Sequence, residues 1–407
     1  MHSIPQIPAA AALLRLGLRL FIGVTLLSPC LARSGLAAPD ATSSETATIS
    51  PPAGAGIPAY HARFERSRPL IAIIGENVGT ELTDFAIPYG VLAASGVAEV
   101  VTVATQPGVL HMRPALTLQP DMTAQEFDAR FPAGADYVIV PAVVKYNDPA
   151  LLSWIKAQGM KGGTLLSICD GAVVVAGTGL MDDHRATAHW ASEKVRRKMF
   201  PQVKWVADIR YVADGKIVST AGISAALPAS LALVEAIAGT ERTRALAADL
   251  GVSEWSTSHS TAPFRPRFGV NLKALITSNY TNHWFHRGEQ LGLTVSTGID
   301  EIALAVTADA YSRTGRSLVH ALSSATEPVR TRHGLLVVPE SVTGLAHPID
   351  RMLPALDSTP SGRWLAKSID GIAQLYGRNT AYGVAIDFEY PIDPALAASS
   401  ARTVSRR

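Results

Sequence analysis

Cysteine is scarce in this sequence: the 407 residues contain two, Cys30 and Cys169. So few thiols exclude a disulfide framework, and a chain of this length can bury a hydrophobic core without one. If the first residues are removed as a targeting signal, Cys30 is lost with them and Cys169 remains alone. An unpaired thiol in an oxidising compartment is a liability unless it is buried or used, which favours a functional role for Cys169.

An excess of charge of one sign is also missing. Lys and Arg number 36 against 34 Asp and Glu, without a long basic run, so we expect no nucleic-acid partner. No glycine-rich phosphate fingerprint follows the first predicted strand, and we expect no cofactor. His283 and His286 could share a helix face and bind zinc, with His259 nearby in the sequence. Because no carboxylate or cysteine stands beside them at ligand spacing, we predict packing or surface histidines and no metal site.

The apolar run nearest the N-terminus is short. Arg15 and Arg19 precede the apolar residues 20–27, and small residues at 35–38 come before a polar stretch. This order is typical of a secretory signal over residues 1–38. A membrane-spanning helix needs about 20 apolar residues, so an uncleaved membrane anchor is the second interpretation.

Residues 39–66 are rich in Ala, Ser, Thr and Pro without periodicity, and we predict a flexible linker. The protein is therefore expected to be exported to the periplasm or the outside of the cell, or to be anchored by its N-terminal segment. Contact with a membrane is expected only through that segment, if it is not cleaved.

Short apolar runs alternate with helical spacing over residues 67–255. Strands are predicted at 70–74, 99–104, 136–141 and 165–168, and helices at 82–93, 151–155, directly after 169 and at 229–238. Continuous apolar strands joined by helices are typical of a parallel sheet that is buried on both faces. The pattern predicts an α/β fold with a doubly wound, flavodoxin-like parallel sheet, in which reactive groups lie beyond the carboxyl ends of the strands.

A similar but shorter pattern follows over residues 256–394. A strand is predicted at 301–306, a helix at 318–322, a strand at 334–340 and a closing helix at 364–373. We interpret this segment as a degenerate second α/β unit without a cysteine strand, although two unrelated α/β modules would look alike. Either a homodimer or an intramolecular pseudo-dimer formed with this unit is possible on the sequence. Residues 395–407 are predicted to be a disordered tail.

Cys169 stands where the run Leu165–Ile168 ends and small and apolar residues at helical spacing begin. A strand that turns sharply into a helix can present a nucleophile above the free N–H groups of the helix. The alternative is that Cys169 is a small buried apolar side chain, as most free cysteines are.

Four separated motifs in this order resemble those of the ThiJ/PfpI family, within the class I glutamine-amidotransferase-like superfamily. They are the acid-plus-proline segment at 82–88, Ser-Ile-Cys-Asp-Gly-Ala at 167–172, Arg-Ala-Thr-Ala-His-Trp at 185–190 and the late strand and turn at 214–225. The resemblance covers about residues 68 to 252. The subgroup that it approaches contains isonitrile hydratases and the sensor domains of AraC-type regulators.

The resemblance implies a nucleophilic Cys169, a carboxyl group of Asp84 touching its sulfur, and a nearby His189. The backbone N–H groups of Asp170 and Ala142 would take the place of an oxyanion hole. A helix N-terminus and a protonated Asp84 would lower the thiol pKa. Asp84 in the first turn of a helix and His189 beside a tryptophan also have structural interpretations.

Two departures from the family pattern count against an active enzyme. Ala142 and Val143 replace the usual Gly-Gly, which narrows the backbone approach to a substrate. Asp170 replaces a neutral residue, and its charge would oppose a thiolate by about 1–3 kcal/mol, unless it only caps the helix.

The first functional hypothesis is a cysteine-dependent hydrolase or hydratase acting on a small molecule through Cys169. The second is a non-catalytic module on the same fold that senses a ligand or an oxidant. Regulators of the subgroup carry a DNA-binding domain, whereas this chain ends in a small basic tail. A third hypothesis is a structural role, in which the second unit occupies a face that relatives use to dimerise.

Overall fold

A computed structural model describes residues 56–392, except 65, 67, 325–326 and 342–343. The predicted signal at 1–38, most of the predicted linker, Cys30 and the predicted tail at 395–407 lie outside the described residues. All the described residues fall within one compact unit. The boundary near residue 255 therefore stays a prediction.

The centre of this unit is a seven-stranded sheet. Neighbouring strands are parallel except β11 and β12, which are antiparallel. In spatial order the strands are β11 (Tyr211–Asp214), β12 (Ile217–Thr220), β8 (Thr164–Ser167), β7 (Tyr137–Val140), β1 (Leu70–Gly75), β3 (Glu99–Ala104) and β6 (Met122–Thr123). This topology confirms the predicted doubly wound α/β class.

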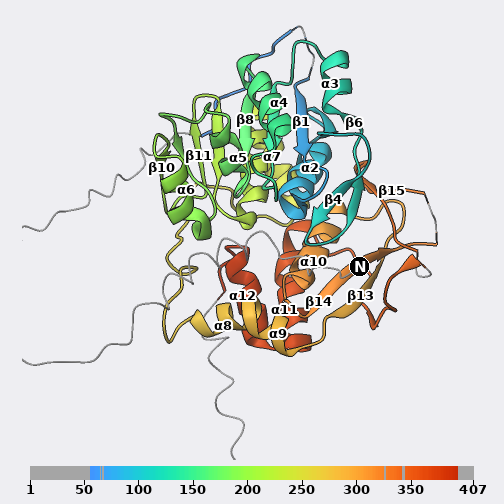
Figure 1. Cartoon of the computed structure of the whole chain (residues 1–407). Helices are drawn as coiled ribbons and strands as arrows, with labels where there is room; N and C mark the ends of the chain where they lie inside the picture. The colour runs from blue at the N-terminus through green and yellow to red at the C-terminus, as the bar shows by residue number, and fades with distance from the viewer. Residues whose placement is uncertain (1–55, 65, 67, 325–326, 342–343, 393–407) are drawn as a thin grey trace, which may run out of the picture. The chain divides into compact units, whose positions relative to one another are not determined.

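Helices cover both faces of the sheet (Figure 1). Side chains alternate across a strand, and in β1 Ile71 and Ile73 join one core while Ala72 and Ile74 join the other. The first core contains α2 (Leu82–Ser95) and α7 (Ala226–Asp249), which pack together. The second contains residues of α3 (Ala124–Arg130), α4 (Pro149–Met160) and α5 (Gly171–Gly177). The continuous apolar runs of the sequence are therefore strands buried on both sides.

We call residues 56–255 the first segment and residues 256–392 the second segment. The remaining elements of the first segment are short. They are β2 (Thr80–Glu81), β4 (Leu110–Arg113), β5 (Thr117–Gln119), β9 (Arg185–Ala186), η1 (Trp190–Ser192), α6 (Glu193–Met199), β10 (Lys204–Trp205) and η2 (Ile223–Ala225). β4 and β5 form an antiparallel hairpin.

Among the described residues, one helical stretch, Ile223–Asp249, is long and apolar enough to cross a membrane. Half of the most apolar part of this stretch is buried inside the structure. The buried residues include Leu231, Leu233 and Val234, which lie in the core with α2. Its apolar composition is therefore explained by packing in the core.

The second segment contains a small parallel sheet in which β13 (Glu289–Thr294) lies between β14 (Ser317–Leu322) and β17 (Arg351–Met352). Its other elements are α8 (Leu272–Ile276), the π-helical turn η3 (Thr277–Thr281), α9 (Asn282–Phe285), α10 (Glu301–Ser312), β15 (Val329–Arg330), β16 (Leu336–Val337), η5 (Ser361–Arg363), α11 (Trp364–Tyr376) and α12 (Arg378–Asp387). The closing helix at 364–373 is confirmed as α11.

Two element types predicted for this segment are wrong. Residues 301–306, predicted as a strand, begin helix α10, and residues 318–322, predicted as a helix, lie in strand β14. Short apolar runs do not distinguish a strand from a buried helix by periodicity. The discriminating signal is Asp300, whose side chain accepts a hydrogen bond from the N–H of Ala303 and caps the alanine-rich helix.

The two segments share both core and sheet contacts. α10 packs against α2 and α11, and a side chain at Gly90 in α2 would overlap Ile302 of α10. β16 pairs antiparallel with β5 of the first segment. The second segment is thus packed directly on the helix that carries Asp84.

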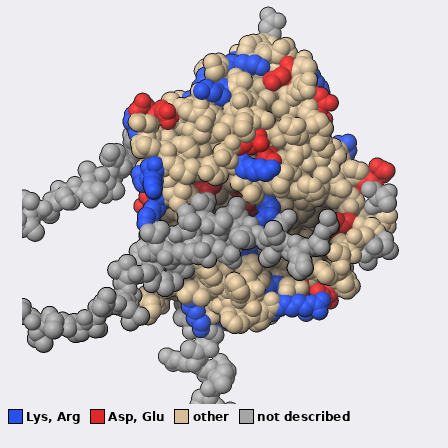
Figure 2. All heavy atoms as spheres, viewed as in Figure 1, with Lys and Arg blue, Asp and Glu red and all other residues tan. Residues whose placement is uncertain are grey.

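Charged side chains of both signs are interspersed over the face drawn in Figure 2. This agrees with the near balance of acidic and basic residues in the sequence.

Candidate functional site

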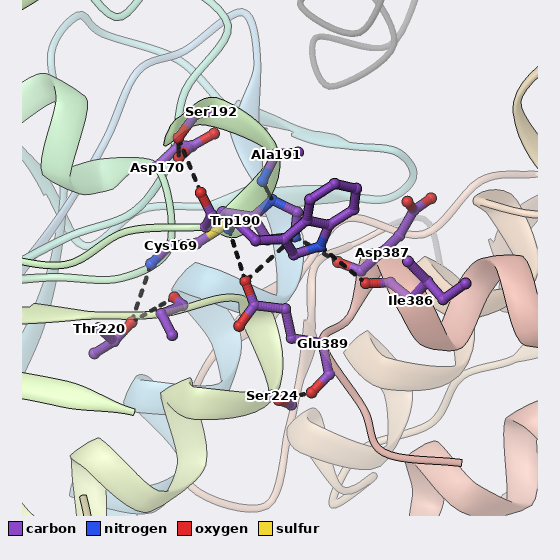
Figure 3. A network of polar contacts seen from close by, with 12 residues as sticks. Cys169, Asp170, Trp190, Ala191, Ser192, Thr220, Ser224, Ile386, Asp387 and Glu389 are labelled. Carbon is purple, nitrogen blue, oxygen red and sulfur yellow. Dashed lines mark hydrogen bonds and ion pairs between the residues drawn. The ribbon is translucent and has the colours of Figure 1, made fainter. Parts of the chain in front are cut away.

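The chain turns sharply at Cys169, between the end of β8 and the start of α5. Cys169 has a φ of 55°, a left-handed conformation that costs a residue with a Cβ about 1–2 kcal/mol. Its N–H donates a hydrogen bond to Oγ1 of Thr220, 3.1 Å away (Figure 3). Position 171 requires glycine, because a Cβ there would overlap the carbonyl oxygen of Val140. The backbone therefore holds Cys169 at a strained strand-to-helix turn.

The thiol of Cys169 lies inside the protein, with the residue 7% exposed. Burial raises the pKa of the Cys169 thiol well above its ordinary value, and the nearby carboxyl groups of Asp84 and Asp170 raise it further. This direction is opposite to the lowered thiol pKa that the resemblance implies, because burial and the nearby carboxyl groups disfavour the thiolate.

Asp84 is fully buried in the first turn of α2. Its Oδ2 accepts a hydrogen bond from the N–H of Ala142 at 3.2 Å, and its Oδ1 has no hydrogen-bond partner in the described structure. Burial raises the pKa of Asp84 well above its usual range, and Glu81 raises it further. Burial thus favours the neutral form of the Asp84 carboxyl group, which is close enough to Cys169 to affect the thiol.

The N–H of Ala142, predicted to serve an oxyanion hole, already donates to Asp84. Its carbonyl oxygen accepts from the N–H of Glu81 at 2.9 Å. Both backbone polar groups of Ala142 are therefore engaged within the protein.

His189 is engaged at both ring nitrogens. Nδ1 accepts a hydrogen bond from the N–H of Ala191 at 3.2 Å, so this nitrogen carries no proton. Nε2 lies 3.0 Å from the carbonyl oxygen of Asp387 and donates to it. Both ring nitrogens are therefore engaged within the protein, and neither offers a free lone pair for the thiol proton.

Glu389 is a buried residue of this region that the sequence did not single out as a site. Its Oε1 accepts from the N–H of Trp190 at 2.8 Å (Figure 3). Its Oε2 lies 2.8 Å from Nε2 of His259. Although burial opposes ionisation, the hydrogen bond with His259 and the nearby His189 lower the pKa of Glu389. Its partners are far away in sequence, so no local spacing could have revealed the cluster.

The segment Ile386–Glu389 packs into the region around Cys169. Gly222 shows how tight the contact is, because a Cβ there would lie 2.7 Å from the side chain of Glu389 and 2.8 Å from the ring of His189. Ser224 also contacts the segment, donating from its N–H to Phe388 and from its hydroxyl to the carbonyl of Glu389.

Asp170 does not cap α5, which has no side-chain hydrogen bond at its N-terminus. Its Oδ1 instead accepts from the hydroxyl of Ser192 at 2.6 Å, and Ser192 also accepts from Arg196. The carboxylate is therefore tied to the loop after His189.

A second buried network joins α2 to α10. Arg313 contacts the carboxyl groups of Glu81 and Asp309, and Thr83 donates to Asp309 at 2.6 Å. Burial opposes the charge of Arg313, but these two acids raise its pKa. The network places a permanent positive charge beside the start of the helix that carries Asp84.

Among residues 56–392 with their gaps, no three His, Cys, Asp or Glu side chains are grouped so that they could hold a metal ion.

Known proteins resemble part of this chain. Residues 71–236 match the model of the DJ-1/PfpI family. The chain is 40% identical over 55 residues to the HTH-type transcriptional regulator CdhR of Pseudomonas aeruginosa, which covers 14% of this chain and 16% of that protein. The match thus spans less than a fifth of the regulator's length.

Similar solved structures include Drosophila melanogaster DJ-1beta, with 20% identity and a TM-score of 0.42 over 46% of this chain and 100% of that chain. An AraC family transcriptional regulator from Pseudomonas putida has 16% identity and a TM-score of 0.40 over 45% of this chain and 99% of that one. A ThiJ/PfpI family protein from Pseudomonas syringae has 18% identity and a TM-score of 0.40, over 50% and 78%. By the family match, residues 71–236 form a domain of the DJ-1/PfpI family.

Proposed function

We propose that this protein is an exported, non-catalytic module that senses a small-molecule ligand on a DJ-1/PfpI domain. The observation that carries the proposal is that the groups a thiol enzyme needs are engaged within the protein. His189 has no free ring nitrogen, and the N–H of Ala142 is bonded to Asp84.

The state of the thiol supports sensing of a ligand rather than of an oxidant. Oxidation and nucleophilic attack both require a thiolate that is accessible. Cys169 is buried, and burial together with Asp84 raises its pKa. A protonated, covered thiol reacts slowly with both peroxide and substrate.

The C-terminal segment gives such a module a means to respond. Ile386–Glu389 contacts the turn at Gly222, the ring of His189 and the backbone of Trp190. A ligand that binds near Cys169 would compete with these contacts and so shift the position of the segment relative to the domain.

A cysteine-dependent hydrolase or hydratase is the second candidate, and Asp84 is the observation that favours it. In the described part of the chain its buried Oδ1 has no hydrogen-bond partner, and burial raises its pKa, which favours the protonated form. A protonated acid that donates to sulfur would stabilise a thiolate.

The pH dependence of alkylation by iodoacetamide separates the two candidates. For a sensing module, we expect slow alkylation of Cys169 near pH 7, with a rate that rises about tenfold per pH unit because only the thiolate reacts. A fast reaction that is independent of pH near neutrality would contradict the sensing module and favour an enzyme.

The variant Asp84→Asn sharpens this test. If Asp84 opposes the thiolate, the neutral amide lowers the thiol pKa and alkylation becomes faster at a given pH. If Asp84 donates to the thiolate, its loss raises the thiol pKa and alkylation becomes slower. Asp148→Asn, at the start of α4, is the control for an unrelated helix N-terminus.

Turnover is the direct measure. We expect the protein to leave isonitriles, amides and reactive aldehydes unchanged, while one class of such compounds raises its melting temperature by binding. Steady turnover that is abolished in Cys169→Ser would establish the enzyme instead.

Export belongs to the same proposal and rests on the N-terminal pattern of Arg15, Arg19 and the apolar residues 20–27. Fractionation of the producing cells, followed by N-terminal sequencing, tests it. We expect the protein outside the cytoplasm with a new N-terminus near residue 38, whereas an intact Met1 in the membrane fraction would support the anchor.

A further inference from the structure

The stretch between the sheet domain and α10 has exposed aromatic side chains that the proposed function does not use. Phe268, Trp284 and Phe285 are 94%, 72% and 80% exposed. Single exposed apolar residues are ordinary in proteins, whereas several large ones in one stretch indicate an interaction surface.

The helical elements of this stretch are fixed to the rest of the structure by their inner side. α8, η3 and α9 follow one another without a break, and α12 contacts α8 and η3 (Figure 1). Leu275 and Ser278 are buried on this side, and Asn282 donates to the carbonyl of Thr314 at 2.7 Å. Trp284 and Phe285 therefore lie on an anchored element.

Large apolar side chains are exposed on the outer side of the same elements, where a surface helix is normally polar. Ile276 is exposed, as are Trp284 and Phe285 at the end of α9, and Phe268 precedes α8. We call Phe268, Ile276, Trp284, Phe285, Arg267 and Lys273 the aromatic–basic surface.

Its charge is of one sign. Residues 256–288 contain no Asp or Glu. Arg265 is paired with Glu193, and Arg287 with Asp350. Arg267 and Lys273 are exposed, and in the part of the chain that the structure describes neither has an ion-pair partner.

We propose that the aromatic–basic surface docks this protein onto an anionic phospholipid bilayer. Trp and Phe side chains partition into the interfacial region of a bilayer, while Lys and Arg are attracted to anionic headgroups. A second copy of this chain is disfavoured as the occupant, because a two-fold contact would bring Arg267 and Lys273 of both copies together. The docking is separate from any anchor at residues 1–38.

The test is co-sedimentation of the purified full chain with vesicles of phosphatidylcholine, with and without phosphatidylglycerol. We expect binding to the anionic vesicles that weakens at raised salt. The triple variant Phe268→Ser/Trp284→Ser/Phe285→Ser should bind the anionic vesicles at least about tenfold more weakly than the unaltered protein. The double variant Arg267→Glu/Lys273→Glu should show a loss of the same size.

Two controls are matched in chemistry. Val78→Ser/Met160→Ser removes exposed apolar side chains of other regions, and Lys156→Glu/Lys204→Glu reverses exposed charges of other elements. Both should bind like the unaltered protein. Brominated lipid should quench part of the tryptophan fluorescence, and this part should be missing in Trp284→Phe.

Three outcomes would overturn the proposal. The first is equal vesicle binding by the triple variant and the unaltered chain, which would assign the binding to another segment. The second is no binding to anionic vesicles at all. The third is a dimer in the absence of lipid that the triple variant converts to a monomer, which would make this surface an interface between copies.

Discussion

The pKa values of two buried carboxyl groups near Cys169 are shifted in opposite directions, and the neighbours of each group explain why. Burial and Glu81 raise the pKa of Asp84, and the single N–H of Ala142 does not offset them. Glu389 is equally buried, but His259 and the N–H of Trp190 stabilise its charge and lower its pKa. Burial thus favours the neutral form of Asp84, whereas the partners of Glu389 outweigh burial and favour its charged form.

Replacing Glu389 by Ala should strongly destabilise the protein. The change leaves His259 and the N–H of Trp190 buried without their acceptor, and removing one partner of a buried pair costs about 3–5 kcal/mol of the free energy of unfolding. Urea unfolding at neutral pH measures the loss. The exposed Glu241→Ala is the control, and a loss equal to that of the control would contradict a structural role for Glu389.

The cost of Glu389→Ala should also depend on pH. Because the pKa of Glu389 is lower in the folded than in the unfolded protein, its contribution is fully present above the ordinary value of 4.5 and is lost as the pH falls through the folded pKa. The difference between the two proteins should therefore shrink under acid conditions. A difference that does not change with pH would show that packing rather than charge is lost.

Asp84 has the opposite linkage. Because the folded pKa is raised, its contribution is fully present below the ordinary value of 3.8 and is lost as the pH rises through the folded pKa. The unfolding free energy of Asp84→Asn should therefore decline less than that of the unaltered protein from mildly acid to alkaline pH. Urea unfolding over this range checks the slope, and parallel curves would contradict a raised pKa of Asp84.

At the scale of elements, the strands of the central sheet were predictable because they are buried on both faces. Every residue of Leu70–Gly75 and of Tyr137–Val140 is buried. Continuous apolar runs of this length are typical of central strands in a parallel sheet. Residues 301–306 and 318–322 have equally apolar sequences, and there the helix and strand were exchanged. The position of Cys169 followed from its strand and helix, whereas the contact of His189 with Asp387 depends on tertiary packing.

The cap of α10 should be worth more than an ordinary cap. Asp300 accepts from the N–H of Ala303, from Arg332 and from Ser361, whereas Asp148 at the start of α4 is shown to accept only from the N–H of Leu151. We expect Asp148→Ala to cost about 1 kcal/mol and Asp300→Ala to cost more. Denaturant unfolding of the two variants gives the comparison, and equal losses would show that the side-chain partners of Asp300 add nothing.

At the scale of the whole molecule, residues of the second segment pack against α2, the helix that carries Asp84. Gly90 of α2 lies against Ile302, and Thr83 of α2 is bonded to Asp309 of α10. Arg313 reaches Glu81 at the start of α2. The second segment therefore supplies apolar and charged partners to the face of the domain that adjoins Cys169.

A fragment that ends at residue 255 should consequently not behave as a monomer. Without α10, the apolar face of α2 is exposed and Glu81 loses Arg313, so we expect self-association or aggregation. Light scattering and thermal unfolding of residues 56–255, compared with residues 56–392, test this expectation. A monomeric fragment that unfolds cooperatively would instead show that the predicted boundary near 255 separates two independent domains. The site around Cys169 would then not depend on the second segment.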